Sequence, residues 1–528
     1  MDALELAADV FVAGGGPAAT WAALQAARDG AQVVLADKGF CGTSGATAAA
    51  GTGVWYVPPE PAAREAAMAS REELGGRLAD RRWAARVLRE TYDRMNELAV
   101  VARYPFPVGE DGAQLRTGLQ GPEYLRRMRI LVRRAGVRVL DHSPVTELLA
   151  DPSGAVAGAA GYRRQARQPY RVRAGAVVLA TGGCAFLSKA LGCDVNTGDG
   201  ALFAVEAGAE LSGMEFSNAY GIAPEGTSVT KTAFYHFATF YRADGSVLEG
   251  ASGIRRTPIA RELLTGKVFC RLDLADERAR TAMRLAQPNF FLTFDRMGID
   301  PFREKFPITL LAEGTVRGTG GIRIVSDDCA TTVPGLYAAG DAATRELICG
   351  GFTGGGSHNA AWAISSGTWA GRGAARYARS LGVRATGRRV RALGEAGLRP
   401  SGPPRDEHRE IVAGVQREVL PYDKNYLRHG NALTASLAEL DGLWTQLRTS
   451  LGGAGESAVR TRQAAAMTAH ARWMYRAALA RPESRGMAKR LDFPDQDSAQ
   501  QHRLRTGGLD QVWVRPERTA EAAAGAAS

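Results

Sequence analysis

The chain has 528 residues, which is enough for two to four domains. Its content of 45% hydrophobic, 23% charged and 7% aromatic residues is typical of globular proteins and excludes a collagenous, fibrous or wholly disordered chain. The net charge of +11 comes from Arg residues scattered through an Ala-rich background rather than from one basic run, so no nucleic-acid partner is expected.

The six Cys residues include no pair at CxxC spacing, and the seven His residues form no HExxH motif, so no metal site is predicted. No run of 18 apolar residues occurs, and the chain opens with acidic residues rather than with an export signal. We therefore expect no membrane span and a cytoplasmic location with reduced thiols.

The first 40 residues predict a strand, a turn, a helix and a second strand. The first strand is expected over 9–13, the helix over 20–29 and the second strand over 32–37. Helical patterns follow over 60–135, and short β-type runs return between 137 and 180. This alternation favours an α/β core.

The alternation stops near residue 217, where a mixture of Gly, Thr, Tyr and Phe begins. It resumes over 318–382, and a Pro-rich linker at 400–404 then precedes helical patterns over 405–490. The sequence therefore predicts an α/β core that is interrupted by an insertion and followed by a helical C-terminal part.

A glycine motif lies between the first predicted strand and helix. Gly14, Gly16 and Ala19 form a GxGxxA pattern, and Asp37 ends the second predicted strand. In a dinucleotide-binding βαβ unit the glycines allow a tight turn and close approach of a pyrophosphate to the helix N-terminus. The small third residue permits helix packing, and the acid accepts a hydrogen bond from the adenosine ribose. Because the motif has its full context, a dinucleotide cofactor is predicted.

Three further glycine-containing segments favour FAD over NAD. A predicted strand runs into a turn at 177–183, a loop opens a helix at 196–200, and another strand ends in Gly-Asp at 335–341. Together they resemble the large FAD-dependent oxidoreductases, in which the residue corresponding to Asp341 binds the flavin ribitol. No second GxGxxG motif is present, so no bound nicotinamide nucleotide is expected.

Six motifs occur in an order that is similar to the succinate dehydrogenase and fumarate reductase flavoprotein family, whose relatives include L-aspartate oxidase and the adenylylsulfate reductase flavoprotein. The motifs lie at 197–200, 207–211, 214–216, 320–322, 340–341 and 483–494. The resemblance implies a Rossmann-like, glutathione-reductase-like FAD-binding domain, an inserted α+β capping domain and a C-terminal helical domain. The expected boundaries are 1–215 and 313–385 for the two segments of the FAD-binding domain, 216–312 for the capping domain, 386–517 for the helical domain and 518–528 for a disordered tail.

The resemblance implies a non-covalent FAD, because the loop 41–51 lacks the His that carries the flavin in covalent members. Thr43 and Ser44 are expected to contact the pyrophosphate or the flavin. Ser357 is expected to cap a helix over 359–379 whose N-terminus points at the flavin pyrimidine ring. The expected cofactor-binding residues are Gly14, Gly16, Pro17, Ala18, Ala19, Asp37, Lys38, Thr43, Ser44, Ala180, Thr181, Gly182, Asp199, Gly340, Asp341, Ser357, His358 and Asn359.

The positions that handle dicarboxylates in the family are changed. Tyr220 stands where the family has a His, Val316 and Arg317 replace a His-Tyr pair, and residues 354–359 lack the Arg of the corresponding motif. A bidentate Arg clamp on a carboxylate is not replaced by Gly, so succinate, fumarate and aspartate are disfavoured as substrates.

The candidate catalytic residues are Arg255, Arg256, Tyr220, His236 and His358. Two adjacent Arg residues above a flavin would lose hydration, and a bound anion would compensate for that loss. Arg255 and Arg256 are therefore expected to clamp or protonate the substrate. His236 lies in a run of aromatic residues, where a buried core histidine is the favoured alternative. His358 either stabilises the reduced flavin as a cation or forms a structural hydrogen bond.

The predicted function is an FAD-dependent oxidoreductase that transfers a hydride between the flavin and a small organic, anionic substrate at a CH–CH or CH–NH bond. Two alternatives stay open. One is an adenylylsulfate-reductase-like flavoprotein subunit with a separate iron–sulfur protein as its electron-transfer partner. The other is an FAD-binding subunit without catalysis.

Overall fold

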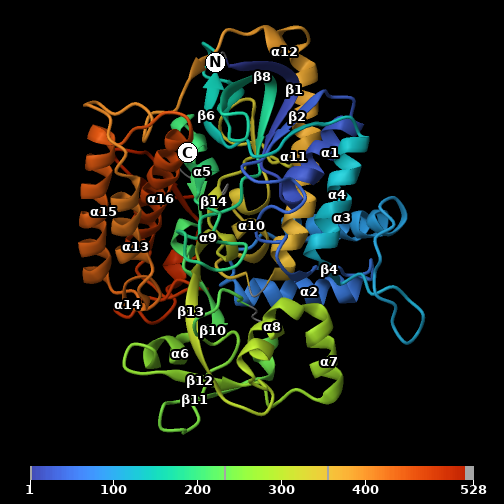
Figure 1. Ribbon diagram of the computed structural model, residues 1–528, viewed down its shortest axis with the longest axis vertical. Helices are drawn as coiled ribbons and strands as arrows, with labels where there is room; N and C mark the ends of the chain where they lie inside the picture. Colours follow the sequence, from blue (N-terminus) through green and yellow to red (C-terminus); the bar gives the residue numbers. More distant parts are fainter. Residues whose placement is uncertain (1–2, 231–232, 354–355, 518–528) are drawn as a thin grey trace, which may run out of the picture.

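The computed structural model describes residues 3–230, 233–353 and 356–517. The tail 518–528, which was expected to be disordered, lies outside the described residues. A large sheet flanked by helices, a group of C-terminal helices beside it and a smaller sheet with three helices at the far end make up the molecule (Figure 1). This arrangement confirms the expected α/β class with a helical C-terminal region.

The large sheet has the strand order β16-β6-β7-β8-β1-β2-β5, and β15 also pairs with β8. Strands β1, β2, β5, β8 and β15 are parallel to one another, while β6 and β7 form an antiparallel extension. The strands are β1 Leu4–Ala13, β2 Val33–Ala36, β5 Arg138–Leu140, β6 Val145–Ala150, β7 Val156–Arg163, β8 Gln168–Leu179, β15 Leu336–Ala338 and β16 Arg391–Ala392. The carboxyl ends of the parallel strands form one edge, where ligands bind in folds of this kind.

The turn between β1 and α1 (Pro17–Arg28) is dictated by glycine. Gly14 has φ +121°, and a Cβ at this position would lie 2.2 Å from the backbone oxygen of Ala180. Only glycine adopts this positive φ without strain and leaves room for the backbone of Ala180. Helix α1 begins three residues earlier than predicted because Pro17 occupies its first turn, where the missing N–H has no cost.

Helices α1, α3, α4 and α11 lie together on one side of the large sheet (Figure 1). Their packing is partly aromatic: the indole N–H of Trp21 donates to the hydroxyl of Tyr124 at 2.7 Å, and Trp83 lies 5.9 Å from Trp362 between ring centroids. Helices α2 to α4 confirm the helical patterns predicted over 60–135. The bounds are α2 Pro61–Leu74, α3 Arg81–Val100, α4 Gly121–Arg134 and α11 Gly356–Leu381.

The smaller sheet contains four antiparallel strands in the order β10-β13-β12-β11. It has its own apolar core, in which the rings of Phe290, Phe291 and Phe294 pack on one another and on Phe306. The elements are β10 Ala219–Pro224, β11 Thr239–Tyr241, α6 Thr257–Glu262, β12 Val268–Arg271, α7 Glu277–Ala286, α8 Pro288–Met297 and β13 Phe306–Glu313. These elements occupy the segment that was expected to form a capping domain.

The C-terminal segment is mostly helical but also contributes strands, which the sequence did not predict. Strand β17 pairs with β9 and β18, and β14 completes this third sheet, so the end of the chain returns to the first half of the molecule. None of the described helices combines the length and the hydrophobicity of a membrane-spanning segment. The remaining bounds are β3 Gly51–Gly53, β4 Gly118–Gln120, α5 Asp199–Glu206, β9 Leu211–Ser212, α9 Gly314–Arg317, β14 Gly321–Ile322, α10 Glu346–Cys349, α12 Arg384–Gly387, α13 His408–Val419, α14 Tyr422–Asn425, α15 Gly430–Ser450, α16 Glu456–Leu479, β17 Leu504–Gly507 and β18 Trp513–Pro516.

A buried cluster of charges joins three distant parts of the chain. The guanidinium of Arg481 forms ion pairs of 2.8 Å with both Glu215 and Glu483. Glu346 lies beside this cluster and accepts a hydrogen bond of 2.6 Å from the hydroxyl of Ser212. Burial, reinforced by the neighbouring carboxylate of Glu215, raises the pKa of Glu346 to about 8. The folded protein therefore holds a proton at Glu346 that the unfolded chain has lost at neutral pH.

This proton predicts a pH-dependent effect of Glu346→Gln. Between pH 4.5 and about 8 only the folded state keeps Glu346 protonated, so its contribution lowers stability as pH rises through this window. The amide removes the titration, and we expect the Tm of the variant relative to wild type to increase by about 1 °C for each kcal/mol gained between pH 5 and pH 8. Thermal unfolding followed by circular dichroism tests this, and a pH-independent Tm difference would contradict it.

Candidate functional site

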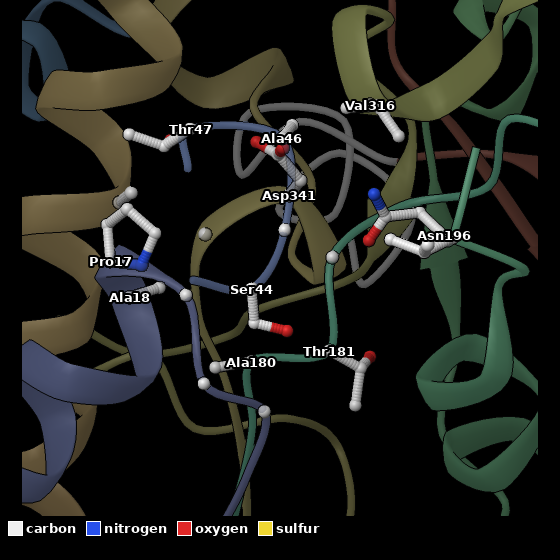
Figure 2. Close-up of a pocket in the computed structure, with 18 of the residues that line it drawn as sticks. Pro17, Ala18, Ser44, Ala46, Thr47, Ala180, Thr181, Asn196, Val316 and Asp341 are labelled. Carbon is white, nitrogen blue, oxygen red and sulfur yellow. The ribbon is translucent and has the colours of Figure 1, made fainter. Parts of the chain in front are cut away.

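The carboxyl ends of the parallel strands border a deep cavity with about 1130 Å³ of empty space, part of which is open to solvent. Pro17 and Ala18 lie on one side of it, Thr181 and Asn196 lie on the other, and Ser44 lies between them (Figure 2). Most of the expected cofactor-binding residues line this cavity. They are Gly14, Gly16, Pro17, Ala18, Asp37, Lys38, Ser44, Ala180, Thr181, Gly182, Asp199, Gly340, Asp341 and Asn359.

Four expected cofactor contacts do not line the cavity. Ala19 is fully buried beneath it, and the exposed hydroxyl of Thr43 donates to the backbone oxygen of Phe40. Helix α11 begins at Gly356, so Ser357 lies inside its first turn instead of capping it. The ring of His358 is buried and packs 4.6 Å from the ring of Trp55, which favours its structural alternative.

The chemistry of the cavity fits a dinucleotide. Asp37 Oδ2, Thr181 Oγ1 and Asn359 Oδ1 are buried and have no hydrogen-bond partner among the described residues. Such atoms are rarely left unsatisfied in a native structure, and ribose, phosphate and flavin groups supply complementary partners. Burial also raises the pKa of Asp37, and hydroxyl donors from a ribose would offset that cost. The cavity therefore has the glycine cradle and the buried polar atoms that bound FAD requires.

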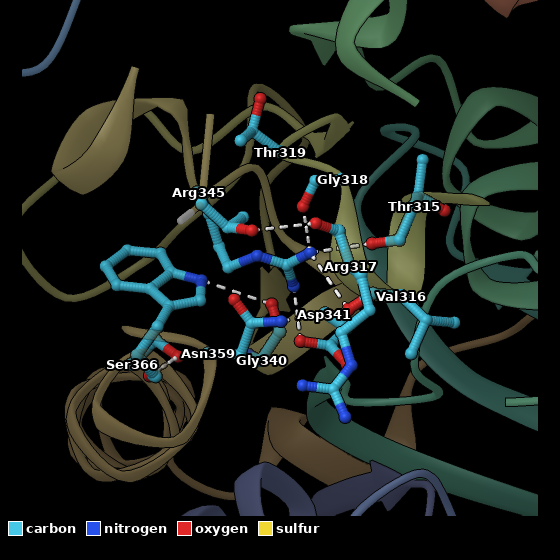
Figure 3. A network of polar contacts seen from close by, with 12 residues as sticks. Thr315, Val316, Arg317, Gly318, Thr319, Gly340, Asp341, Arg345, Asn359 and Ser366 are labelled. Atoms are coloured by element: carbon cyan, nitrogen blue, oxygen red, sulfur yellow. Dashed lines mark hydrogen bonds and ion pairs between the residues drawn. The ribbon is translucent and has the colours of Figure 1, made fainter. Parts of the chain in front are cut away.

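One guanidinium connects the cavity to the loop beside it. Arg345 is fully buried, and its side chain forms an ion pair with Asp341. It also donates to the backbone oxygens of Thr315 at 2.7 Å, of Val316 at 3.2 Å and of Gly318 (Figure 3). Burial raises the pKa of Asp341, and the positive charge of Arg345 opposes that shift. Arg345 therefore holds a cavity carboxylate and the loop in one fixed arrangement.

The same loop presents Arg317 to the cavity. The carbonyl of Val316 also accepts from Asn359 at 3.1 Å, and that of Arg317 accepts from Thr353 at 2.9 Å. With these carbonyls engaged, the side chains of Val316 and Arg317 line the cavity. The nearest acid of the loop, Glu313, lies 4.0 Å from Arg317 Nε. Arg317 was expected only as the loss of a family residue, although a new cation three residues before the Gly-Gly-Ile motif was the signal.

Other lining residues were also missed. Asn196 begins the glycine segment 196–200, Phe203 lies on the helix α5 that this segment opens, and Thr47 and Thr52 lie in and just after the loop in which only Thr43 and Ser44 were singled out. Their side chains carry no motif, and only the tertiary fold brings them to the cavity.

A second cavity with about 1560 Å³ of empty space collects three of the catalytic candidates. Tyr220, Arg255 and Arg256 line it, and none of the three lines the first cavity. The hydroxyl of Tyr220 donates to the backbone oxygen of Val419 at 2.9 Å, and burial raises its pKa, so this phenol is a poor acid or base. His236 is exposed, so its interpretation as a buried core residue is wrong, and it lines neither of these two cavities.

Comparisons with known proteins agree with this geometry. The family described as FAD binding domain matches residues 9–308, and the family described as fumarate reductase flavoprotein C-term matches residues 421–511. The L-aspartate oxidase of Streptomyces coelicolor is 28% identical, with 93% of this chain and 90% of that protein covered. E. coli quinol fumarate reductase FrdA has the same fold, with a TM-score of 0.82 at 20% identity over 98% of this chain and 97% of that one. Adenylylsulfate reductase of Archaeoglobus fulgidus gives a TM-score of 0.79 at 16% identity over the same shares of the two chains.

The first family match covers more than half of the chain, and the second covers the region of the C-terminal motif. FAD is therefore the cofactor that the first cavity is built to hold. The chain belongs to the succinate dehydrogenase and fumarate reductase flavoprotein family, and it is an FAD-dependent oxidoreductase.

Proposed function

We propose that the protein transfers a hydride between FAD and a carbon of a small organic anion, at a CH–CH or CH–NH bond next to a carbonyl group. The observation that carries this proposal is Arg317, whose guanidinium lines the cofactor cavity while no carboxylate lies closer than 4.0 Å to its Nε. A cation kept in a low-dielectric site loses hydration, and a bound anion compensates for that loss.

When bound, FAD supplies the two-electron chemistry by accepting or giving a hydride. The residues of the chain supply orientation and charge. Arg317 would use the N–H donors of its planar guanidinium to stabilise negative charge that develops beside the carbonyl group of the substrate. Asp341 would anchor the ribityl chain, and Arg345 would keep that anchor and the Arg317 loop in register.

The cofactor would be held without a covalent bond, since the loop 41–51 contains no His. The electron acceptor is part of the proposal: either molecular oxygen or a separate electron-transfer protein takes the electrons from the reduced cofactor. The six Cys residues are all buried and free in this chain, and the described residues form no metal site, so any cluster would belong to the partner.

Arg317→Gln tests the proposed role of this residue in the reaction. We expect FAD to stay bound and the rate of substrate-driven flavin bleaching to fall about 10²–10³-fold, as when one electrostatic stabiliser is removed from an active site. Anaerobic absorption spectroscopy with the amino, keto or saturated acid that bleaches wild type most rapidly gives the rate. Arg323→Gln is the control, because Arg323 pairs with Glu210 and Glu517 away from the cavity. Equal rates in wild type and Arg317→Gln would remove Arg317 from the mechanism.

Arg345→Met tests the positioning of Asp341. The substitution leaves a carboxylate without its buried partner, so we expect the Kd for FAD to rise at least about tenfold, equivalent to about 1.4 kcal/mol. Fluorescence titration of the apoprotein with FAD measures the Kd. The double variant Arg345→Met/Asp341→Asn removes both charges, and Arg376→Met, on the exposed face of α11, serves as the control. An unchanged Kd in Arg345→Met would contradict this role.

Acid precipitation tests the proposal that FAD is held without a covalent bond. After acid precipitation of the purified holoprotein, all flavin absorbance should appear in the supernatant. Flavin that stays with the pellet would overturn the non-covalent assignment.

A further inference from the structure

The second cavity has a composition that the proposed reaction at the first cavity does not explain. It lies where the smaller sheet, helix α2 and the C-terminal segment meet, and it shares no lining residue with the cofactor cavity. Its walls come from several chain segments that are distant in sequence, between Ser70 and Gln496, so the tertiary fold alone creates it. A concave site of this size, lined by apolar and a few charged groups, has the general features of a small-molecule site.

Positive charge dominates the polar part of this cavity. Arg255, Arg256 and Lys489 line it, and Glu73 is the only acid among the described lining residues. Among the described residues, no carboxylate lies within ion-pair distance of Arg255 or Lys489. Burial lowers the pKa of Lys489, which shows that its ammonium group is held partly out of water without a counter-ion. Three cations around one hollow favour an anionic ligand.

The rest of the cavity wall is apolar or aromatic. Ile254, Phe352, Tyr426 and Met487 line it together with Leu74. The rings of Tyr220 and Tyr426 meet edge to face at 5.7 Å, so this wall is preorganised rather than loose. A short dianion such as succinate has only two methylene groups to place against such a wall, and its second carboxylate would be desolvated there at a cost.

The second cavity is electrostatically connected to the cofactor cavity. Arg256 donates to the backbone oxygen of Tyr220, whose strand β10 pairs with β13 through Ala312. The next residue, Glu313, lies 4.0 Å from Arg317, and its charge also acts on Arg256. The end of β13 therefore lies between the cations of the two cavities. The carboxylate of Glu313 interacts with a cation of each cavity.

We propose that the second cavity binds an organic monoanion with an apolar or aromatic body, with the carboxylate held by Arg255 and Lys489 and the body packed against Phe352, Tyr426 and Met487. This inference rests on the proposed function only in taking an organic acid as the substrate; the binding site itself is argued from the lining residues of the second cavity. It separates this chain from relatives named for aspartate and fumarate.

Binding to the FAD-loaded protein tests the inference directly. Isothermal titration uses 3-phenylpropionate as the probe, succinate as the short dianion and 3-phenylpropanamide as the neutral isostere. We expect 3-phenylpropionate to bind at least about tenfold more tightly than either. Arg255→Met/Lys489→Met should weaken it at least about tenfold while keeping the apolar side-chain stems. Arg261→Met is the matched control, because Arg261 is exposed on the short helix α6 that follows Arg255 and does not line the cavity.

Two results would overturn the inference: succinate binding as tightly as 3-phenylpropionate, or unchanged affinity for 3-phenylpropionate in the double variant. A separate measurement tests the reaction itself. In the photoreduced, anaerobic holoprotein, cinnamate should restore the oxidised flavin spectrum, with a hydride added at C3, a proton added at C2 and 3-phenylpropionate formed. Binding of 3-phenylpropionate without this spectral change would support the cavity and count against the proposed hydride transfer to this class of acid.

Discussion

The buried contact between Arg345 and Asp341 is the constraint on which the rest of the site depends. An isolated guanidinium in the protein interior is strongly unfavourable, so its N–H donors need acceptors. The two terminal nitrogens of Arg345 donate to one carboxylate of the first cavity and to three carbonyls of the loop that follows β13, while Nε has no hydrogen-bond partner among the described residues. Because these donors belong to one planar group, the carboxylate of Asp341 and the loop that carries Arg317 are tied to each other.

Charge balance between the two cavities follows from this arrangement. Arg317 and Arg256 stand on opposite sides of the end of β13, and Glu313 is the acid between them, where it also accepts a hydrogen bond of 2.6 Å from Thr230. One carboxylate does not neutralise two guanidinium groups, so the region keeps a net positive charge in a partly desolvated environment. Anionic ligands on either side would lower the electrostatic energy, and this is consistent with an enzyme that handles organic acids.

The sequence predicted the cofactor edge well because the signals there are local. Gly14, Gly16 and Asp37 lie within one βαβ unit, and their spacing alone places them at the ends of adjacent parallel strands. The loops after β8 and β15 were likewise recognised by short glycine motifs. Ser357 failed as a cap because α11 begins one residue earlier, and element ends are set by tertiary contacts that no local pattern records.

Residues positioned by distant segments could not be predicted in the same way. Arg317 reaches the cavity only because Arg345, Asn359 and Thr353 hold its backbone, and those partners lie up to 43 residues away. The strands β17 and β18 are short and carry no alternation long enough to detect, so their return to β9 appeared only in the structure. The run of aromatic residues around His236 is also divided by the fold, since Phe234 and Tyr235 are buried while His236 and Phe237 are exposed.

The substrate-facing changes relative to the family are best understood as a relocation of positive charge rather than its loss. The Arg expected within 354–359 is absent, yet Arg317 enters the cofactor cavity and Arg255, Arg256 and Lys489 surround the neighbouring one. A clamp designed for a four-carbon diacid needs two cationic groups facing each other across a short gap. In this chain the cations instead lie in two cavities, which the end of β13 separates. The wall of the second cavity also carries apolar side chains. Such a distribution matches one carboxylate and an apolar body better than two carboxylates, because only the former leaves no charge against the apolar wall.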